Sequence, residues 1–357
     1  MHPASTTAKA LATAAFFHQA VIACILALMF SLSTVKNSIA QPKPAAIDMD
    51  KLVTDAKREG QLTYYLTATE NVARRTSDAF KKEYGIDAQF VRLTSAALKQ
   101  RFGAEAQASN IAADLLIDTG AGSEQFVAEG LSKNWLQPVE DANLPILRSG
   151  GFPKQFVRGA AVIVQVSPWL IAYNTTKFKP GQAPKSWADL TDQALKGQIL
   201  FTSFANASPS YMDMLELLLK QYGPDYMSRI RNLEPRWYNG GVPAMNALAA
   251  GEGAVMFPAV GSMVAGLKDK GAPIDLYQPD FTTGVEQILL LAAPDKSKRP
   301  NAARLFANWI MGRDGNKIVN ADPGNVSVYD TANLPRAYQA PGTRENRERI
   351  LRLLDSK

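Results

Sequence analysis

Four short stretches of the sequence place small, hydroxylated or glycine residues directly ahead of a predicted helix: 67–70, 118–123, 203–210 and 238–241. Backbone N–H groups at a helix start lack intrahelical partners and carry partial positive charge, so they bind carboxylate or phosphate oxygens. The chemistry that these turns predict is reversible capture of an anion. The candidate ligand-binding residues on them are Thr67, Thr69, Thr119, Gly120, Ser203, Ser208, Ser210, Tyr238, Asn239 and Gly240.

The same residue types also serve as ordinary helix caps, because Ser, Thr, Asp and Gly are favoured at N-caps whether or not a ligand is present. Each single turn is open to that simpler explanation, whereas the set of four favours a ligand role for at least two. Glu70 fits an anion site poorly unless it binds an ammonium group of the same ligand. Otherwise it is a first-turn acid that complements the helix dipole.

Side chains close to these turns extend the candidate site. Arg236 can clamp a carboxylate or phosphate with its planar fork, whereas Arg92 is explained more simply as surface charge. Phe257 and Tyr238 are candidate aromatic walls, and Tyr238 is the stronger because Asn-Gly-Gly follows it. Three further aromatic residues fit the same description, although most aromatic side chains of α/β domains pack in the core: Tyr64, Trp169 and Trp237.

The first forty residues differ in composition from the rest. They carry two lysines and no acidic residue, with an apolar run over residues 20–32. A bilayer span needs about 20 apolar residues, and small residues lead up to Ala40. We therefore expect a signal peptide over residues 1–40, a spacer over 41–47 and a periplasmic location. The alternative is an uncleaved anchor.

This leader contains both histidines and the single cysteine, His2, His18 and Cys24. Removing it excludes disulfides, Cys-His and Ser-His-Asp catalysis and histidine-based zinc sites from the mature chain. We therefore expect no enzymatic activity, no cofactor and no resident metal. The net charge of +6 falls to +4 without the two leader lysines. This mild excess is spread along the chain, unlike the basic stripe of a nucleic-acid binder, and it favours anionic solutes slightly.

The remaining chain is long enough for two domains and alternates between strand and helix patterns. Strands at 61–66, 86–93 and 113–117 alternate with helices at 50–59, 70–84, 95–108 and 123–130, which predicts a mostly parallel sheet covered by helices. Strands at 160–166 and 169–173 read as a crossover, although 169–173 also fits an interior strand of one large domain. A second block follows, with strands at 198–201 and 254–257 and helices at 211–222, 225–232 and 242–250. The strand at 288–293 then returns the chain to the first block, followed by helices at 301–310, 314–320 and 344–354.

Several short motifs of the sequence occur in a characteristic order: AEGL followed by Trp135, LIAYNT from Leu170, PKSWADL from Pro184, KGQI from Lys196, AAGEGAV from Ala249 and NAARLFANWIMGRDGNKIV from Asn301. Together, over roughly residues 48–323, they resemble family 1 extracellular solute-binding proteins, in the branch that includes ferric-iron-binding proteins of ABC importers. The resemblance implies a two-lobed, type II periplasmic binding protein. It would have a mostly parallel sheet in each lobe and a ligand cleft between them.

On this resemblance the first lobe would comprise residues 48–168 and about 280–312. The second would comprise 169–279, and we expect the helices of 313–357 to lie on it. The protein would act as a monomer, bind a small molecule rather than nucleic acid, and deliver it to an inner-membrane ABC permease. We expect a small organic anion, such as a carboxylate, phosphonate or phosphate ester, captured by hinge closure of the lobes.

Ferric iron, or an iron chelate, is the main alternative ligand. Ferric-binding relatives carry adjacent tyrosines near the strand after a word like Gly251-Glu252, but residues 254–260 here include no tyrosine. Tyr64 and Tyr65 are adjacent within one predicted strand, so their side chains should point to opposite faces. This departure argues against iron. A second alternative is a binding protein that reports its ligand to a membrane receptor.

Overall fold

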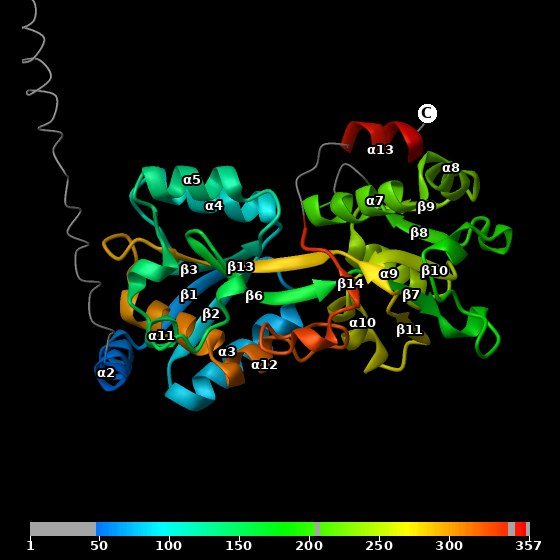
Figure 1. The fold of residues 1–357 in the computed structure, drawn as a ribbon. Helices are drawn as coiled ribbons and strands as arrows, with labels where there is room; N and C mark the ends of the chain where they lie inside the picture. Colours follow the sequence, from blue (N-terminus) through cyan, green and yellow to red (C-terminus); the bar gives the residue numbers. More distant parts are fainter. Residues whose placement is uncertain (1–47, 204–207, 342–346, 355–357) are drawn as a thin grey trace, which may run out of the picture. The chain divides into compact units, whose positions relative to one another are not determined.

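The computed structural model describes residues 48–203, 208–341 and 347–354 of the chain. They belong to one compact unit that runs from Ala45 to Lys357 and contains two large mixed sheets (Figure 1). The expected signal peptide and spacer lie outside the described residues. We call the seven-stranded sheet with its helices the first lobe and the five-stranded sheet with its helices the second lobe.

The first-lobe sheet has the strand order β2-β1-β3-β13-β6-β5, and β4 also pairs with β13. These strands are β1 (Gln61–Leu66), β2 (Asp87–Arg92), β3 (Leu115–Thr119), β4 (Leu136–Gln137), β5 (Val157–Arg158), β6 (Ala161–Pro168) and β13 (Gly284–Ala292). Only β1–β2 and β1–β3 are parallel, whereas β13 runs antiparallel to β3, β4 and β6. The expected mostly parallel sheet is therefore wrong in this detail, because β13, which returns from the second lobe, lies between β3 and β6 and runs opposite to both.

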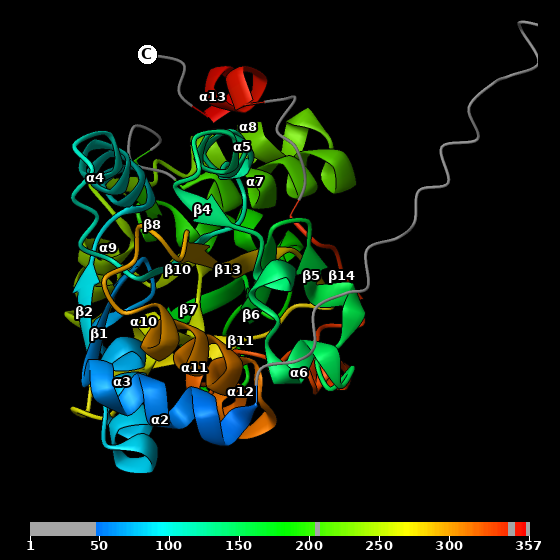
Figure 2. The same cartoon turned by 90° about the vertical axis from the view of Figure 1, so that its left-hand side faces the viewer.

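Helices cover both faces of this sheet. One face carries α4 (Ser95–Gln107) and α5 (Glu124–Ser132), and the other carries α3 (Glu70–Tyr84), α11 (Pro300–Met311) and α12 (Arg313–Val319) (Figures 1 and 2). Helix α2 (Met49–Glu59) packs against α11, and the short α6 (Pro145–Arg148) also contacts α11. Helix α2 starts where the Asp48 carboxylate accepts the Asp50 N–H and ends at Gly60, whose φ of 76° suits a residue without a side chain.

The second-lobe sheet has the order β11-β7-β10-β8-β9. Its strands are β7 (Leu170–Asn174), β8 (Ile199–Thr202), β9 (Arg236–Tyr238), β10 (Val255–Ala259) and β11 (Ile274–Tyr277). Side chains alternate between two cores: Phe201 and Phe257 pack toward α7 (Pro209–Tyr222) and α8 (Pro224–Asn232), whereas Leu200 and Met256 pack toward α9 (Gly241–Ala249) and α10 (Gly261–Lys268). This sheet is also mixed, with β10–β8 and β8–β9 parallel.

The chain crosses between the lobes at Trp169, because β6 ends at Pro168 in one sheet and β7 begins at Leu170 in the other. Of the two explanations open for this segment, the crossover is the one found. The short strands β12 (Phe281–Thr282) and β14 (Ala337–Tyr338) pair beside the return crossing into β13. Short 3-10 turns complete the description: 139–142, 154–156, 175–177, 188–191, 193–195 and 331–333.

The helices after Gly312 divide between the lobes. Helix α12 packs on α3 and α11 of the first lobe, whereas α13 (Arg347–Leu354) packs on α7 and α8 of the second. Ile350 and Leu354 enter the second-lobe core with side chains that are almost fully buried. The expectation that all of residues 313–357 lie on the second lobe is therefore wrong for α12. This helix comes directly after α11 in the chain and packs against it.

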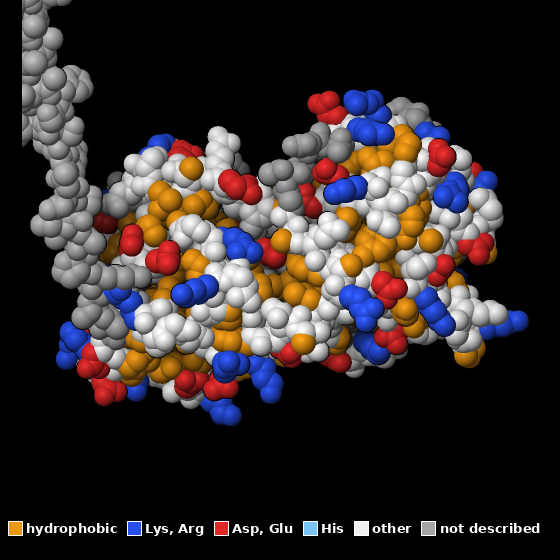
Figure 3. Space-filling view, viewed as in Figure 1, with side chains coloured by type: hydrophobic (Ala, Val, Ile, Leu, Met, Phe, Trp, Pro, Cys, Tyr) orange, Lys and Arg blue, Asp and Glu red, His pale blue; other side chains and the backbone are white. Residues whose placement is uncertain are grey.

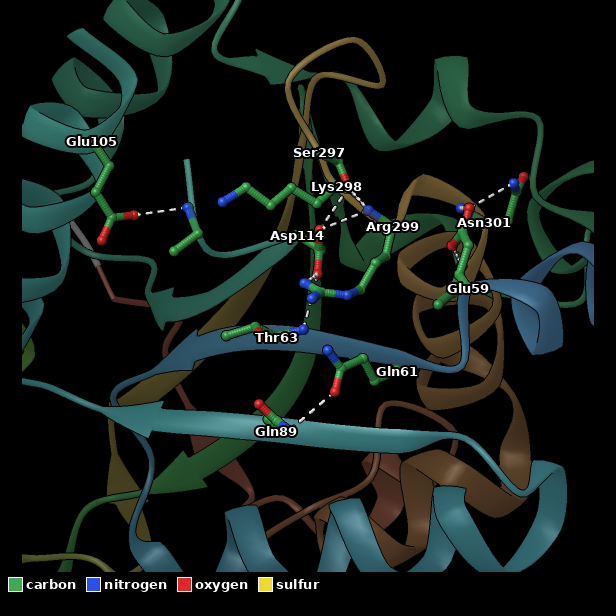
Figure 4. A network of polar contacts seen from close by, with 12 residues as sticks. Glu59, Gln61, Thr63, Gln89, Glu105, Asp114, Ser297, Lys298, Arg299 and Asn301 are labelled. Atoms are coloured by element: carbon green, nitrogen blue, oxygen red, sulfur yellow. Dashed lines mark hydrogen bonds and ion pairs between the residues drawn. The ribbon is translucent and has the colours of Figure 1, made fainter. Parts of the chain in front are cut away.

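A buried polar network ties early and late parts of the first lobe together (Figure 4). The Asp114 carboxylate, which is 1% exposed, accepts the Thr63 N–H at 2.9 Å, the Ser297 hydroxyl at 2.8 Å and the Arg299 N–H at 3.0 Å. The Glu59 carboxylate accepts the N–H groups that open α11, including that of Ala302 at 2.7 Å. These bonds satisfy buried donors that a bare strand edge and helix start would leave unpaired.

Candidate ligand-binding site

The carboxyl ends of β1 and β3 bring two expected residues together. The Thr67 hydroxyl lies 3.4 Å from that of Thr119 and donates to the Gln287 side-chain oxygen at 2.8 Å. Gln287 stands opposite Thr119 in the β13–β3 register. Gln287 could not be predicted from local patterns, because it lies inside an apolar strand that comes 168 residues later in the chain than Thr119.

The turn from β3 into α5 is held rigidly by Asp118. Its buried carboxylate accepts the Thr119 N–H at 2.8 Å and the Ser123 hydroxyl at 2.9 Å, with the Lys99 ammonium 3.5 Å away. Burial raises the pKa of Asp118, and the attraction of Lys99 and the hydrogen bonds oppose that rise. A side chain at Gly120 would lie 3.0 Å from Ile288 and 3.3 Å from a backbone oxygen, so this turn requires glycine for close approach.

A pocket of about 480 Å³ lies beside this turn, between α5 and the strands β6 and β13. Gly120 and Ser123 line it together with Arg158 and Glu286. Burial raises the pKa of Glu286, while Arg158 and the Tyr338 hydroxyl, 3.3 Å from a carboxylate oxygen, oppose the rise. The remaining wall is largely apolar. The pocket is a groove of the first lobe, because α5, β6 and β13 all belong to that lobe.

Of the third turn, residues 204–207 lie outside the described residues. The Ser203 N–H donates to the Tyr238 carbonyl at 2.7 Å, which joins the third and fourth turns. Ser208 caps α7 by accepting the Tyr211 N–H, as the simpler explanation of these turns predicts. Ser210 is fully buried, and its hydroxyl has no hydrogen-bond partner among the residues that the structure describes.

Two of the larger candidate side chains in the fourth turn bind protein groups. The Arg236 guanidinium donates to the Glu252 carbonyl at 2.7 Å, and the Tyr238 hydroxyl donates to the Glu252 carboxylate at 2.9 Å. Burial raises the pKa of Tyr238, and the Glu252 carboxylate raises it further. Asn239 and Gly240 precede α9 with no side-chain cap, which leaves the first N–H groups of that helix without a side-chain partner in the described chain.

Most of the expected aromatic walls lie in the core instead. Phe257 is 1% exposed and its ring packs against that of Phe201, with centroids 4.7 Å apart, so its place in the candidate site is corrected. It occupies the β10 face that points toward α7. Tyr64 and Trp169 are buried as well, whereas Trp237 is 40% exposed.

Thr69, Glu70 and Asn71 of the first lobe face α9 and α10 of the second across a pocket of about 470 Å³. Arg92, at the end of β2, completes the first-lobe wall. The second-lobe wall consists of Val242, Met245, Asn246, Ser262, Met263, Gly266, Leu267 and Lys270. Thr69 is the only residue of the expected set in this wall, and Arg92, expected to be plain surface charge, belongs to it.

The charges around this interlobe pocket are unequally compensated. The Glu70 carboxylate is paired with Arg74 at 2.5 Å, and the Asn71 amide donates to Asp322. Arg92 donates from Nε to the Ala68 carbonyl at 3.1 Å. Within the described chain, neither Arg92 nor Lys270 pairs with a carboxylate. On the face shown in Figure 3, by contrast, charges of both signs are interspersed.

The described residues include no group of three or more His, Cys, Asp or Glu side chains that could hold a metal ion. Tyr64 and Tyr65 point to opposite faces, as predicted. The Tyr64 hydroxyl donates to the Ala73 carbonyl in α3, and the Tyr65 hydroxyl donates to the Glu105 carboxylate in α4. No helix within the described ranges has both the length and the apolar character that a membrane span requires.

Two open mixed sheets joined by crossing strands, with a pocket between them, define a two-lobed periplasmic binding protein. Residues 76–346 match the model of the bacterial extracellular solute-binding protein family, and the chain belongs to that family. An uncharacterized protein of Haemophilus influenzae is 24% identical over 276 residues, which cover 74% of this chain and 76% of that protein.

Solved structures show the same fold. The substrate-binding protein of an ABC transporter from Agrobacterium tumefaciens aligns with a TM-score of 0.68 at 15% identity, covering 82% of this chain and 94% of that one. Iron-bound HitA from Pseudomonas aeruginosa gives 0.61 at 18% identity, covering 83% and 98%. AfuA from Actinobacillus pleuropneumoniae, solved with fructose-6-phosphate, gives 0.56 at 18% identity, covering 83% and 97%. This chain is accordingly a bacterial extracellular solute-binding protein.

Proposed function

We propose that this protein captures a small organic anion in the interlobe pocket and delivers it, as a monomer, to an ABC permease in the inner membrane. The ligand carries a carboxylate, phosphonate or phosphate-ester group. The protein reaches the periplasm through a cleavable signal peptide over residues 1–40, and the lobes close on the ligand about the crossing strands. It binds its ligand without turning it over.

The observation that carries the proposal is the pair of cations at the interlobe pocket. Arg92 and Lys270 line it from opposite lobes, and the one carboxylate among its lining residues, Glu70, forms an exposed ion pair with Arg74. An anion that binds both cations would bridge the lobes and favour their closed arrangement. The fork of Arg92 is also suited to hydrogen-bonding a planar carboxylate with two parallel N–H groups.

Iron is the rival ligand, because HitA, which is similar in fold, was solved with iron bound. The carboxylates of this chain do not gather for that purpose within the described residues, and burial raises the pKa of Tyr64 and Tyr65, which disfavours the phenolate form. The acidic side chains here instead fix helices and turns, as Asp118 and Glu59 do.

Thermal unfolding of residues 41–357 in the presence of simple carboxylates, phosphonates, phosphate esters and ferric citrate tests the proposal. A ligand that binds only the folded state stabilises it by about 2.7 kcal/mol at a hundredfold excess over its dissociation constant. We expect a concentration-dependent rise in midpoint with one class of organic anion. A rise with ferric citrate alone, accompanied by a phenolate-to-iron absorption band, would refute the anion assignment and leave the family assignment intact.

A further inference from the structure

We infer that the ligand is an amphipathic monoanion: a carboxylate whose apolar body packs on α9 and α10 of the second lobe. This inference rests on the proposed function, because it assigns the ligand class of the same interlobe pocket. It narrows that class from organic anions in general to those with a sizeable hydrocarbon portion.

The second-lobe wall of the pocket carries an apolar stripe from two helices beside the polar side chains of Asn246, Ser262 and Lys270. On α9, Val242 and Met245 are three residues apart, and on α10, Met263 and Leu267 are four apart, so each pair lies on one helix face. Val242 is 43% exposed and Met263 and Leu267 are half-buried, whereas Met245 belongs to the core beneath them. Exposed and half-buried apolar side chains gathered in a pocket offer a surface that an apolar part of a ligand can cover.

Two glycines shape this stripe. A side chain at Gly241 would lie 2.8 Å from the terminal carbon of Met263, so glycine there lets that methionine lie across the start of α9. Gly266 has nothing within 4 Å of the position that a side chain would occupy, and it lies between Met263 and Leu267 on the pocket wall. Gly241 thus makes room for Met263, whereas the space over Gly266 is open to a ligand.

The polar side chains of the pocket stand on both walls, and Asn246, Ser262 and Lys270 belong to the second-lobe wall. Arg92 and the Thr69 hydroxyl, which is buried with no hydrogen-bond partner among the described residues, belong to the first-lobe wall. Glu70 forms an exposed ion pair with Arg74. A carboxylate held between Arg92 and Lys270, with an apolar body over Val242, Met263 and Leu267, contacts both walls.

The volume agrees with such a ligand. A cavity of about 470 Å³ falls within the range of about 300–1,000 Å³ that is usual for small-molecule sites. A sugar phosphate of similar size would place several hydroxyl groups against Val242, Met263 and Leu267. Hydroxyl groups that face these three side chains would lose water without gaining hydrogen bonds from them, which is costly.

Isothermal titration of residues 41–357 with 4-phenylbutanoate, acetate and fructose 6-phosphate tests the inference. We expect 4-phenylbutanoate to bind at least about tenfold more tightly than acetate, because only it covers the stripe. Arg92→Gln should weaken 4-phenylbutanoate binding about tenfold, since it removes a charged hydrogen-bond donor. Arg58→Gln, on exposed α2, is the matched control and should leave binding unchanged.

Val242→Thr probes the second-lobe wall separately, because it exchanges a methyl for a hydroxyl at an exposed position that does not support the core. It should weaken 4-phenylbutanoate binding about threefold to fivefold and leave acetate binding unchanged. Equal affinity for 4-phenylbutanoate and acetate, or no effect of Val242→Thr, overturns the inference. If fructose 6-phosphate binds more tightly than 4-phenylbutanoate, the inference is overturned and the proposed function stands. If only ferric citrate or spermidine binds, and none of the organic anions does, both the inference and the proposed function are overturned.

Discussion

Replacing Gly261 by Ala should separate α10 from the loop that follows α12. An added Cβ at this position would lie 1.4 Å from the carbonyl oxygen of Pro323, and ordinary contacts begin at 3.4 Å. The oxygen belongs to the backbone and the position of Cβ is set by the backbone, so no side-chain rotation relieves the overlap, and helix or loop must retreat by about 2 Å. Overpacking of this kind costs about 1–3 kcal/mol, and the absence of a flexible partner places Gly261→Ala at the upper end.

Gly266→Ala provides the matched control in the same helix. Nothing lies within 4 Å of the added methyl group, and alanine is favoured over glycine inside a helix by about 1 kcal/mol. The two substitutions are chemically identical and five residues apart, yet we expect opposite signs. Gly261→Ala should lower stability, and Gly266→Ala should leave it unchanged or raise it.

Urea unfolding of residues 41–357, followed by tryptophan fluorescence and far-ultraviolet circular dichroism, measures both changes. Each kcal/mol lost should lower the thermal midpoint by roughly 2–4 °C in a protein of this size. The steric reasoning fails if Gly261→Ala is as stable as Gly266→Ala. Because α10 forms one wall of the interlobe pocket, Gly261→Ala should also weaken the binding of any ligand that bridges the lobes.

Three further changes test other parts of the structure. The folded-state pKa of Glu286 is raised, so the stability it contributes is full below its unfolded pKa and is lost as pH rises through the folded value. Glu286→Gln should therefore be more stable than wild type at pH 7 and equal near pH 4 in urea titrations; a constant difference would contradict this. Asp322→Asn should lower the free energy of unfolding by about 1–3 kcal/mol, because it weakens the 2.9 Å bond from Arg75. Equal urea midpoints for the variant and the wild type would contradict this. Glu59→Ala should cost about 1–2 kcal/mol because α11 loses its acceptor, and an unchanged unfolding midpoint would rule out that capping role.

Local patterns in the sequence predicted the long elements well. The helix expected at 50–59 is α2, and its stop at Gly60 is confirmed by a left-handed backbone there. The two-residue strands β4, β5, β12 and β14 had no period to detect, since a pairing of two residues is set by neighbours distant in sequence. Helix α10 was missed because it contains two glycines, and it forms where its start packs against the loop at Pro323.

In the candidate site, too, some features were predicted from local patterns and others depend on residues distant in sequence. Thr67 and Thr119 were predicted and do meet, because the carboxyl ends of neighbouring parallel strands converge at one sheet edge. Arg236 and Tyr238 have suitable chemistry, but Glu252, in the turn between α9 and β10, accepts hydrogen bonds from both. Such a competition between ligand and protein partners depends on tertiary distances, which no local pattern records.

The position of β13 in the first sheet has a consequence for the order in which the chain can fold. This strand lies between β3 and β6, yet it is made of residues 284–292, whereas every strand of the second sheet comes from residues 170–277. The second sheet can therefore assemble from one continuous segment, and the first must wait for a strand that follows it. Until then β3 and β6 present unpaired edges, which are sites where strands of other chains add. We therefore expect misassembly of this protein to begin at the incomplete first sheet, because that sheet is completed late, and not because its packing is weak.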